Sequence, residues 1–334
     1  MTHVLGLDAG NTKTVALLAR LDGEIVGSGR AGCGDIYGAG SSGVYGTGSP
    51  ELALAAVEAA ISGALGNCHP AAIAASCFSM AGADWPEDYE LIRAELARRG
   101  FRQNVAIYND AIGALRAGSP DGYGVAVACG TGTATGARAP DGRWWHTSYW
   151  QEPQGAHELG RMTLDAVYRA ELGLEPPTAL TARVLAWFPA ETVEQVLHAM
   201  TARVSPGRPD LGRLARGLLD EAAAGDATAR RLVQTHGTAM GEYALVAARR
   251  VGLAHSDFTL VMAGSVLRHP APELKEALVA RVRAEVPGVR PVLSRFEPVV
   301  GAVLLALEQA GVSVDEAVLA RMAASLPPAA LFAT

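Results

Sequence analysis

A short turn near the start of the chain contains the residue types that bind phosphate. Residues 4–7 predict a buried strand, and the sequence D-A-G-N-T-K follows at residues 8–13. Gly10 and Asn11 tolerate positive φ, so the chain can turn tightly and point backbone N–H groups, a hydroxyl and a lysine at one place. The carboxylate of Asp8 is placed to hold a hydrated Mg²⁺ ion, which prefers oxygen ligands. An ordinary hairpin with Asn-Thr at its tip is the alternative interpretation.

A second turn of the same kind lies far along the sequence. An apolar strand at residues 125–128 runs into G-T-G-T at residues 130–133, and the chain continues as another strand. Two such strand–turn–strand units predict a duplicated architecture in which both halves hold one ligand.

Asp110 lies between these two units, after the apolar strand 105–108 and at the start of a helix. An acid there can be the cap of the helix, or it can be a base that faces the ligand at the carboxyl edge of the sheet. The helix dipole should favour the ionised form of this carboxylate.

Composition limits the class of protein. The 334 residues correspond to roughly two domains of about 150 residues each. Hydrophobic residues make up 49% and charged residues 19% of the chain, so two cores can be filled. A formal charge of −6 and a pI of about 5.8 argue against nucleic acid or an anionic membrane as a partner. The four cysteines form no C-x-x-C pair and no signal-peptide pattern opens the chain, so we expect reduced thiols and a cytoplasmic location.

Hydrophobic periodicity and turn residues predict alternating strands and helices around these turns. In the first half we expect three strands within 2–30, a helix at 50–66, a strand at 71–80, a helix at 86–98 capped by Asp84, and a strand at 105–108. The sequence G-S-P-D-G at 118–122 has linker composition and predicts a domain boundary. In the second half we expect strands at 123–129, 133–139 and 143–149, helices through 161–253, strands at 258–262 and 292–293, and a helix at 298–310.

Five short motifs together resemble one family. They are D-x-G-x-T-K-T from residue 8, M-A-G-A-D at 80–84, N-D-A at 109–111, G-T-G-T at 130–133 and A-G-S-V at 263–266. In this order they resemble the N-acetylglucosamine kinase branch of the BadF/BadG/BcrA/BcrD ATPase family, within the actin-like ATPase superfamily. The resemblance extends over nearly the whole chain.

The resemblance implies an α/β fold with two ribonuclease H-like (actin-like ATPase) domains that flank a nucleotide and substrate cleft. The first domain would be residues 1–118, with the C-terminal helices of residues 298–334 packing back on it. The second would be residues 119–297, with a helical insertion at about 161–253. It also implies ATP and Mg²⁺ as cofactors, with Asp8 holding the metal through water. The nucleotide would contact Asp8, Gly10, Asn11, Thr12, Lys13, Gly130, Thr131, Gly132, Thr133, Gly264 and Ser265.

The same resemblance implies a sugar site, and this sequence departs from the family there. The sugar would contact Asp35, Asp84, Asp110, Gly155, His157 and Glu158. Asp35 stands about where the family usually has Asn, and His157 stands where the family has a sugar-binding Asp. These departures leave the phosphate chemistry intact and leave the identity of the sugar open. Aromatic residues between 144 and 150 could stack on a sugar face or pack within the sheet.

The activity that we expect is phosphoryl transfer from ATP to a hydroxyl of an amino sugar, such as N-acetylglucosamine, glucosamine or N-acetylmuramic acid. Asp110 would accept the hydroxyl proton, as the equivalent Asp of the family does. We expect a small-molecule sugar as the partner, a homodimer as the assembly, and neither nucleic acid nor membrane as a partner.

Three alternatives stay open. An activator ATPase of the same family shares a metal cluster through cysteines of two subunits, but Cys129 is the last cysteine here. A non-catalytic sugar sensor would keep the fold, although no helix-turn-helix precedes residue 4. One type of pantothenate kinase also opens with Asp-x-Gly-Asn-Thr, but this chain is longer than that type.

Overall fold

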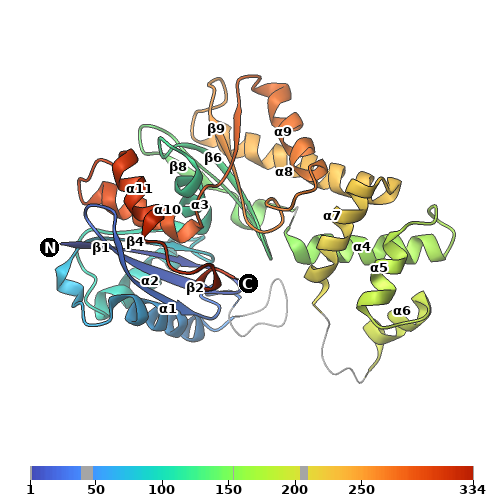
Figure 1. The fold of residues 1–334 in the computed structure, drawn as a ribbon, viewed down its shortest axis with the longest axis horizontal. Helices are drawn as coiled ribbons and strands as arrows, with labels where there is room; N and C mark the ends of the chain where they lie inside the picture. The colour runs from blue at the N-terminus through green and yellow to red at the C-terminus, as the bar shows by residue number, and fades with distance from the viewer. Residues whose placement is uncertain (1, 39–47, 153, 204–209, 334) are drawn as a thin grey trace.

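Two five-stranded sheets with helices on their faces form the framework of the chain (Figure 1). The computed structural model describes residues 2–38, 48–152, 154–203 and 210–333. The chain runs through the first sheet, crosses to the second sheet, forms a helical region, and returns to both sheets near its end.

The first sheet has the strand order β3-β2-β1-β4-β5. Its strands are β1 His3–Ala9, β2 Thr14–Arg20, β3 Ile25–Ala31, β4 Ile73–Met80 and β5 Val105–Asn109. The first three strands are antiparallel, whereas β4 and β5 run parallel to β1. Both faces of the central strands are buried, which explains why β1 and β4 read as nearly continuous apolar runs.

The second sheet repeats this arrangement with the order β10-β9-β6-β7-β8. Its strands are β6 Gly124–Cys129, β7 Thr133–Arg138, β8 Trp144–His146, β9 Thr259–Ala263 and β10 Arg290–Leu293. The strands β6, β7 and β8 are antiparallel, and β9 and β10 run parallel to β6. Read outward from β1 and from β6, the two sheets have the same topology, so the predicted duplicated α/β architecture is confirmed.

Helices cover the outer faces of both sheets. On the first sheet, α1 (Pro50–Leu65) packs against β2 and β3, and α2 (Pro86–Arg98) lies on the same side. Ser49 caps α1 by accepting a hydrogen bond from the N–H of Leu52 at 3.3 Å, as the Ser-Pro-Glu sequence predicts. On the second sheet, α8 (Ala227–Arg250) packs against β6 and β7, and α9 (Glu273–Glu285) packs on α8.

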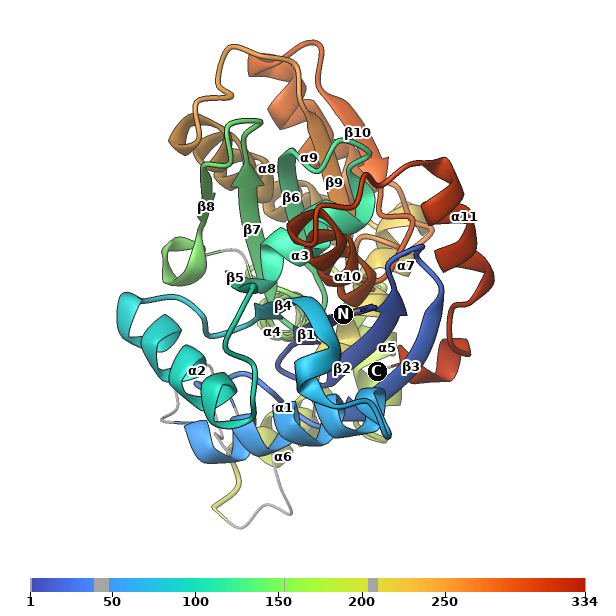
Figure 2. The same ribbon diagram turned by 90° about the vertical axis from the view of Figure 1, so that its left-hand side faces the viewer.

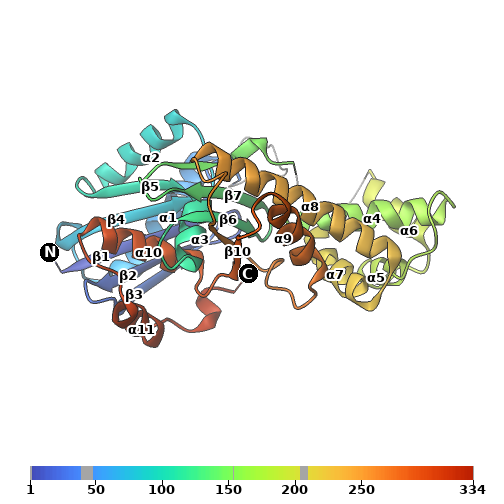
Figure 3. The ribbon, with the colours of Figure 1, turned by 90° about the horizontal axis from the view of Figure 1, so that it is seen from above.

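A helical region projects from the second sheet as an arm (Figures 1 and 3). It contains α4 Ala156–Glu171, α5 Leu180–Trp187, α6 Val193–Thr201 and α7 Leu214–Ala224. The first of these helices begins at Ala156, a few residues before the predicted start of the helical stretch at 161. Buried leucines and valines of the arm join the core of the second sheet in one continuous cluster.

Two helices lie between the sheets (Figure 2). Helix α3 (Asp110–Gly118) packs against β6 and β7, while α10 (Pro298–Gln309) packs against β1, β4 and α3. The apolar residues of α10 belong to the same cluster as Val4 and Val15 of the first sheet. The last helix, α11 (Glu316–Ala324), also joins this cluster. The exact domain boundaries, residues 1–118 with 298–334 and residues 119–297, stay a prediction.

Within the described ranges, no helix is both long and apolar enough to cross a membrane. The four cysteines are all free thiols, two of them fully buried.

The crossing of α3 and α10 is close because two glycines meet there. A Cβ atom on Gly301 would lie 1.9 Å from the carbonyl oxygen of Gly113. We therefore predict that Gly301→Ala lowers the free energy of unfolding by about 1–3 kcal/mol or more, because backbone must move to admit the methyl group. Gly32→Ala is the matched control, since a Cβ there meets no atom within 4 Å. Chemical denaturation compares the two variants, and equal midpoints would contradict the close crossing.

Candidate active site

The predicted nucleotide residues gather at the carboxyl ends of strands from both sheets. Asp8 lies at the end of β1 and Asp110 directly follows β5. Gly130 follows β6, and Gly264 follows β9. Ligands of α/β folds commonly bind at this edge of the sheet.

The two phosphate-type turns face each other. The hydroxyls of Thr12 and Thr131 are 2.9 Å apart, although the two residues are far apart in sequence. A Cβ on Gly132 would lie 3.9 Å from the side-chain nitrogen of Asn11, so the amide of the first turn reaches the second turn. The structure therefore brings both turns together, as the duplicated pattern predicts.

Backbone contacts fix the shape of each turn. The N–H of Gly10 donates to the carbonyl of Lys13 at 2.9 Å, and the N–H of Gly130 donates to Gly132 at 2.9 Å. Gly155 packs directly on the second turn, since a Cβ at Gly155 would come within 2.4 Å of the carbonyl oxygens of Gly130 and Gly132. Thr133 donates its hydroxyl to the sulfur of Cys129 at 3.3 Å, so this hydroxyl already has a partner within the protein.

Gly264 has a structural reason for its residue type. Its φ is +88°, and a Cβ would lie 2.3 Å from the carbonyl oxygen of Cys129. The N–H of Val266 donates to the same carbonyl at 3.1 Å. The neighbouring side chain, Ser265, is exposed. Contact of Gly264 and Ser265 with the nucleotide stays a prediction.

Lys13 is held by the C-terminal segment. Its ammonium group donates to the carbonyl of Phe332, and burial lowers its pKa. Arg30 donates to three further carbonyls of this segment, at distances of 2.7 to 3.1 Å. Glu297, at the start of α10, lies close to both Lys13 and Asp8. Its charge adds to the rise in the pKa of Asp8 and partly opposes the fall in the pKa of Lys13. Glu297 also forms an ion pair with Arg268. Sequence patterns did not mark Glu297, because its closeness to the turn results from the return of the chain to the first sheet.

Two carboxyl groups at the centre of the site have strongly raised pKa values. The pKa of Asp110 is raised to about 8. Burial is the largest cause, and the nearby acids Asp8, Asp84 and Asp35 also contribute. Burial likewise raises the pKa of Asp8 to about 7, with Lys13 opposing the shift. The expectation that the helix dipole keeps Asp110 ionised is therefore wrong for the free protein, because burial and like charges outweigh the dipole.

Asp110 is also not the cap of α3. Asn109 takes that place, with its side-chain oxygen accepting from the N–H of Ala111 at 3.1 Å. Asp110 occupies the first helical position and its carboxyl group faces the other acids.

Asp84 does not cap α2, which corrects the sequence prediction. Asp88 instead accepts hydrogen bonds from the N–H groups of Asp84 and Trp85, at 3.1 and 2.7 Å. The carboxylate of Asp84 accepts from the side-chain nitrogen of Asn109 at 3.0 Å, and burial raises its pKa to about 6. This bond places Asp84 directly beside Asp110.

Asp35 lies on the other side of the same acidic group. It is 8% exposed, and its carboxylate accepts from the N–H of Tyr37 at 2.9 Å. A Cβ on Gly82 would lie 2.5 Å from a carboxylate oxygen of Asp35, so the 80–84 turn packs directly on it. Burial raises the pKa of Asp35 above its usual range.

The predicted sugar residues of the second half lie on the first turn of α4. His157 is exposed, and Glu158 is paired with Arg161 of the same helix at 2.6 Å. Among the described residues, neither side chain makes a hydrogen bond or ion pair with Asp35, Asp84 or Asp110. Their contact with a sugar, like that of Gly155, stays a prediction.

A different segment of the second half does reach the acidic group. The imidazole Nδ1 of His146 lies 3.9 Å from Asp84, and Tyr149 stacks on Trp85. Burial lowers the pKa of His146 to about 4, so this ring is neutral. The cluster of aromatic residues around position 146 was the only sequence signal for this contact.

The metal expectation rests on a single carboxylate. Within residues 2–38, 48–152, 154–203 and 210–333, no group of three or more His, Cys, Asp or Glu side chains could hold a metal ion. Mg²⁺ commonly uses one or two carboxylates, several waters and substrate phosphates. Asp8 fits this pattern in its position, because it lies at the end of β1 directly before the turn at residues 10–13.

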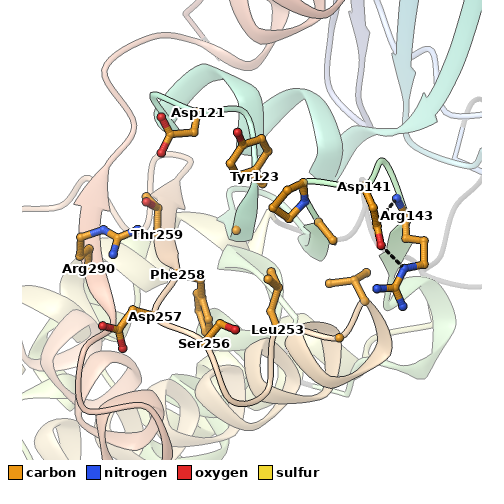
Figure 4. Close-up of a pocket in the computed structure, with 15 residues that line it drawn as sticks. Asp121, Tyr123, Asp141, Arg143, Leu253, Ser256, Asp257, Phe258, Thr259 and Arg290 are labelled. Atoms are coloured by element: carbon orange, nitrogen blue, oxygen red, sulfur yellow. Dashed lines mark hydrogen bonds and ion pairs between the residues drawn. The ribbon is translucent and has the colours of Figure 1, made fainter.

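A cavity of about 460 Å³ lies at the opposite end of the second sheet (Figure 4). It is lined by residues at the beginnings of β6, β9 and β10, including Gly124, Thr259 and Arg290. Because the turn at residues 130–133 and Gly264 follow the other ends of β6 and β9, this cavity is separate from the candidate active site.

The two sheets of matching topology and the facing turns define a two-domain actin-like ATPase fold. The profile of the BadF/BadG/BcrA/BcrD ATPase family matches residues 5–306, and the chain belongs to this family. The resemblance drawn from the five motifs is thus confirmed. A comparison with curated proteins finds no match.

Solved structures support the fold assignment. The provisionally named N-acetylglucosamine kinase of Chromobacterium violaceum has a TM-score of 0.61 at 21% identity, and that of Porphyromonas gingivalis has 0.63 at 19%. A ROK family glucokinase from Streptomyces griseus has a TM-score of 0.57 at 16% identity. Each comparison covers 92% of this chain and 99% of the other. At these identities the likeness establishes the fold.

The contact between the turns generates a prediction about nucleotide binding. Thr131→Val removes the hydroxyl that meets Thr12, and a phosphate hydrogen bond with it, so we expect nucleotide affinity to fall at least about tenfold. Thr135→Val is the matched control, because the hydroxyl of Thr135 is buried on β7, the strand that follows the turn, and has no partner among the described residues. Calorimetric titration with ATP measures both variants, and equal affinities would remove the turn from nucleotide binding.

The raised pKa of Asp110 predicts how stability depends on pH. The folded state holds the proton up to about pH 8, whereas an unfolded Asp loses it near its ordinary value of 3.8. The stabilisation from this proton is complete below the unfolded pKa and is lost as the pH rises through the folded pKa. The amide of Asp110→Asn does not titrate, so the variant does not lose stability in this way as the pH rises. Its melting temperature should therefore exceed that of the wild type by a margin that grows from pH 5 to pH 8.5. A wild type that is more stable than the variant at pH 8.5 would mean that the carboxylate is compensated.

Proposed function

We propose that this protein is an ATP-dependent kinase that transfers the γ-phosphate to a hydroxyl of an amino sugar. The observation that carries the proposal is the position of Asp110, whose buried carboxyl group lies close enough to Asp8 of the first turn and to the acids Asp84 and Asp35 for all three to raise its pKa. A base at that position separates a phosphate end of the site from an end that can accept hydrogen bonds from hydroxyl or amino groups.

The transfer needs few groups from the protein. The sugar oxygen forms a new bond to the γ-phosphorus, the bond from that phosphorus to the bridging oxygen breaks, and ADP leaves with the electron pair. Asp110 takes the hydroxyl proton, and the turns at residues 10–13 and 130–133 hold the phosphates by backbone N–H groups and hydroxyls. Asp8 is the residue that would hold Mg²⁺ through water, and the ion would supply positive charge that offsets the charge of the phosphates.

The acidic character of the sugar end bears on the substrate. Burial raises the pKa values of Asp84 and Asp110, the nearby Asp35 adds to both shifts, and the imidazole beside Asp84, His146, is neutral. A carboxylate at position 35 only accepts hydrogen bonds, whereas the Asn usual in the family also donates. An amino sugar whose nitrogen donates hydrogen bonds suits this arrangement better than an acylated one does.

The fold relatives support the same class of reaction. Two of them are provisionally named N-acetylglucosamine kinases, and the Streptomyces griseus glucokinase was crystallised with glucose and AMPPNP. An activator-type ATPase is less well supported, because Cys129 is fully buried and its sulfur accepts the hydroxyl of Thr133. A sensor that binds sugar and nucleotide without turnover is the remaining second candidate.

A coupled ADP-release assay against glucosamine, N-acetylglucosamine, N-acetylmuramic acid and simple hexoses tests the proposal. Turnover of an amino sugar supports the kinase. Retained ATP binding with no turnover of any sugar would reject it and favour the sensor.

Asp110→Asn sharpens this test, because the amide keeps the shape of the carboxyl group but cannot take a proton. We expect the sugar-dependent rate to fall by about 10²- to 10⁴-fold while ATP binding is retained. In the wild type, kcat/KM, which reports the ionisation of the free enzyme, should fall as the pH drops below about 8, where Asp110 becomes protonated. Full activity of the folded variant would mean that another group, such as Asp84, accepts the proton.

A further inference from the structure

The segment from His146 to Tyr149 connects the two sheets at the sugar end of the site. It follows β8 and passes into a short 3₁₀ turn, Ser148–Trp150. Thr147 anchors it to β7, because its buried hydroxyl donates to the carbonyl of Thr135 at 3.2 Å. With Thr147 fixed toward its own sheet, the residues on either side of it face Asp84 of the first sheet.

Two buried polar atoms of this segment have no hydrogen-bond partner. They are Nδ1 of His146 and the hydroxyl oxygen of Ser148. Nδ1 lies 3.9 Å from a carboxylate oxygen of Asp84, which is too long for a hydrogen bond. The Ser148 hydroxyl is close enough to lower the pKa of Asp84, yet its geometry is not that of a normal hydrogen bond. Unsatisfied buried polar groups are uncommon and costly, so two of them beside one carboxylate point to a polar group that binds there.

The backbone at Ser148 is strained in addition. Its φ is +48°, a region that residues other than glycine, asparagine and aspartate seldom occupy. The hydrogen bonds of Thr147, to Thr135 and to Gln151 at 2.7 Å, hold the segment in this conformation. Strain that the surroundings maintain is typical of sites where a side chain is positioned for a ligand.

Exposed aromatic rings lie next to these polar atoms. Trp85 and Tyr149 stack with ring centroids 6.3 Å apart at 9°, and they are 43% and 46% exposed. Tyr37 meets Tyr149 edge-on at 5.7 Å. A carboxylate, a hydroxyl and an imidazole beside open aromatic faces suit a polyhydroxylated ring, which has hydroxyls at its edge and C–H groups on its face.

We propose that Asp84, His146 and Ser148 together bind one hydroxyl of the sugar, and that the rings of Trp85 and Tyr149 contact the sugar ring. A hydroxyl both donates and accepts, so it can donate to the carboxylate and satisfy an orphaned atom of the facing segment. This inference rests on the proposed kinase function. It adds a recognition segment, residues 146–149, for which the aromatic residues were the only sequence signal.

Ser148→Gly and Ser148→Ala test the inference, because a structural role and a ligand-binding role predict different results. Glycine removes the hydroxyl and relieves the positive φ, so the melting temperature should stay the same or rise. Both variants should raise the KM for the sugar about tenfold, the value of one hydrogen bond, with kcat and the KM for ATP little changed. Asn104→Gly is the matched control: Asn104 has a φ of +50° far from the site, and its replacement should leave the sugar KM unchanged.

His146→Phe provides a second test. The Phe ring can keep the stacking on Trp144, which has centroids 5.7 Å apart at 16°, while the ring nitrogen is lost. We expect a similar rise of the sugar KM. Unchanged sugar KM in the Ser148 variants and in His146→Phe, with lowered melting temperatures, would overturn the inference and leave the segment a structural bridge.

Equilibrium binding separates this inference from the kinase proposal. Tryptophan fluorescence titrated with glucosamine and with N-acetylglucosamine reports binding through Trp85 without any turnover. If the protein is inactive but its sugar binding is weakened about tenfold in Ser148→Ala, the recognition segment is supported and the kinase proposal is rejected. If the protein is an active kinase and the variant has unaltered sugar affinity, only the recognition segment is rejected. If the protein binds neither sugar, both proposals are rejected.

Discussion

The burial of four carboxyl groups close to one another is the constraint on which the rest of this structure depends. Asp8, Asp35, Asp84 and Asp110 come from four different segments of the first sheet, and burial raises the pKa of each one. Lys13 is the cation that opposes the shift at Asp8, but its own ammonium group is partly desolvated. Bringing these groups together opposes folding, and a bound cation or a donor-rich ligand would relieve the repulsion.

Packing elsewhere must offset this cost. The apolar face of α10 buries most of its length against β1, β4 and α3, and α3 begins at Asp110 itself. The close glycine contact of these two helices sets how near α3 lies to the first sheet, and thereby where Asp110 stands relative to Asp8. A tightly packed part of the molecule thus supports an unfavourable cluster of buried carboxyl groups, as expected where a site is built for a ligand instead of for stability.

Much of the fold could be predicted from local patterns, because strands and helices here follow the apolar periodicity of their own residues. The turn at residues 8–13 and its partner at 130–133 were recognisable because a similar pattern of glycine and threonine follows a buried strand twice in the chain. The cap of α2 was assigned wrongly to Asp84, and Asp110 was weighed as either a cap or a base. The N-cap positions of the two helices are held by the neighbouring residues Trp85 and Asn109, and local sequence does not rank two adjacent candidates. Glu297 and the orphaned atoms of His146 and Ser148 were beyond sequence reasoning, since only tertiary contact brings them to the acids.

The C-terminal segment has a practical consequence for anyone who handles this protein. Its backbone carbonyls at residues 330–333 accept hydrogen bonds from Arg30 and Lys13, at the edge of the first phosphate-type turn. An affinity tag fused to that end would begin beside the turn and would compete with the segment for its place. The first strand, by contrast, enters the sheet at His3, at the opposite end of β1 from Asp8. Tags and surface attachments are therefore better joined at the N-terminus, where they leave the ammonium group of Lys13 and its surroundings undisturbed.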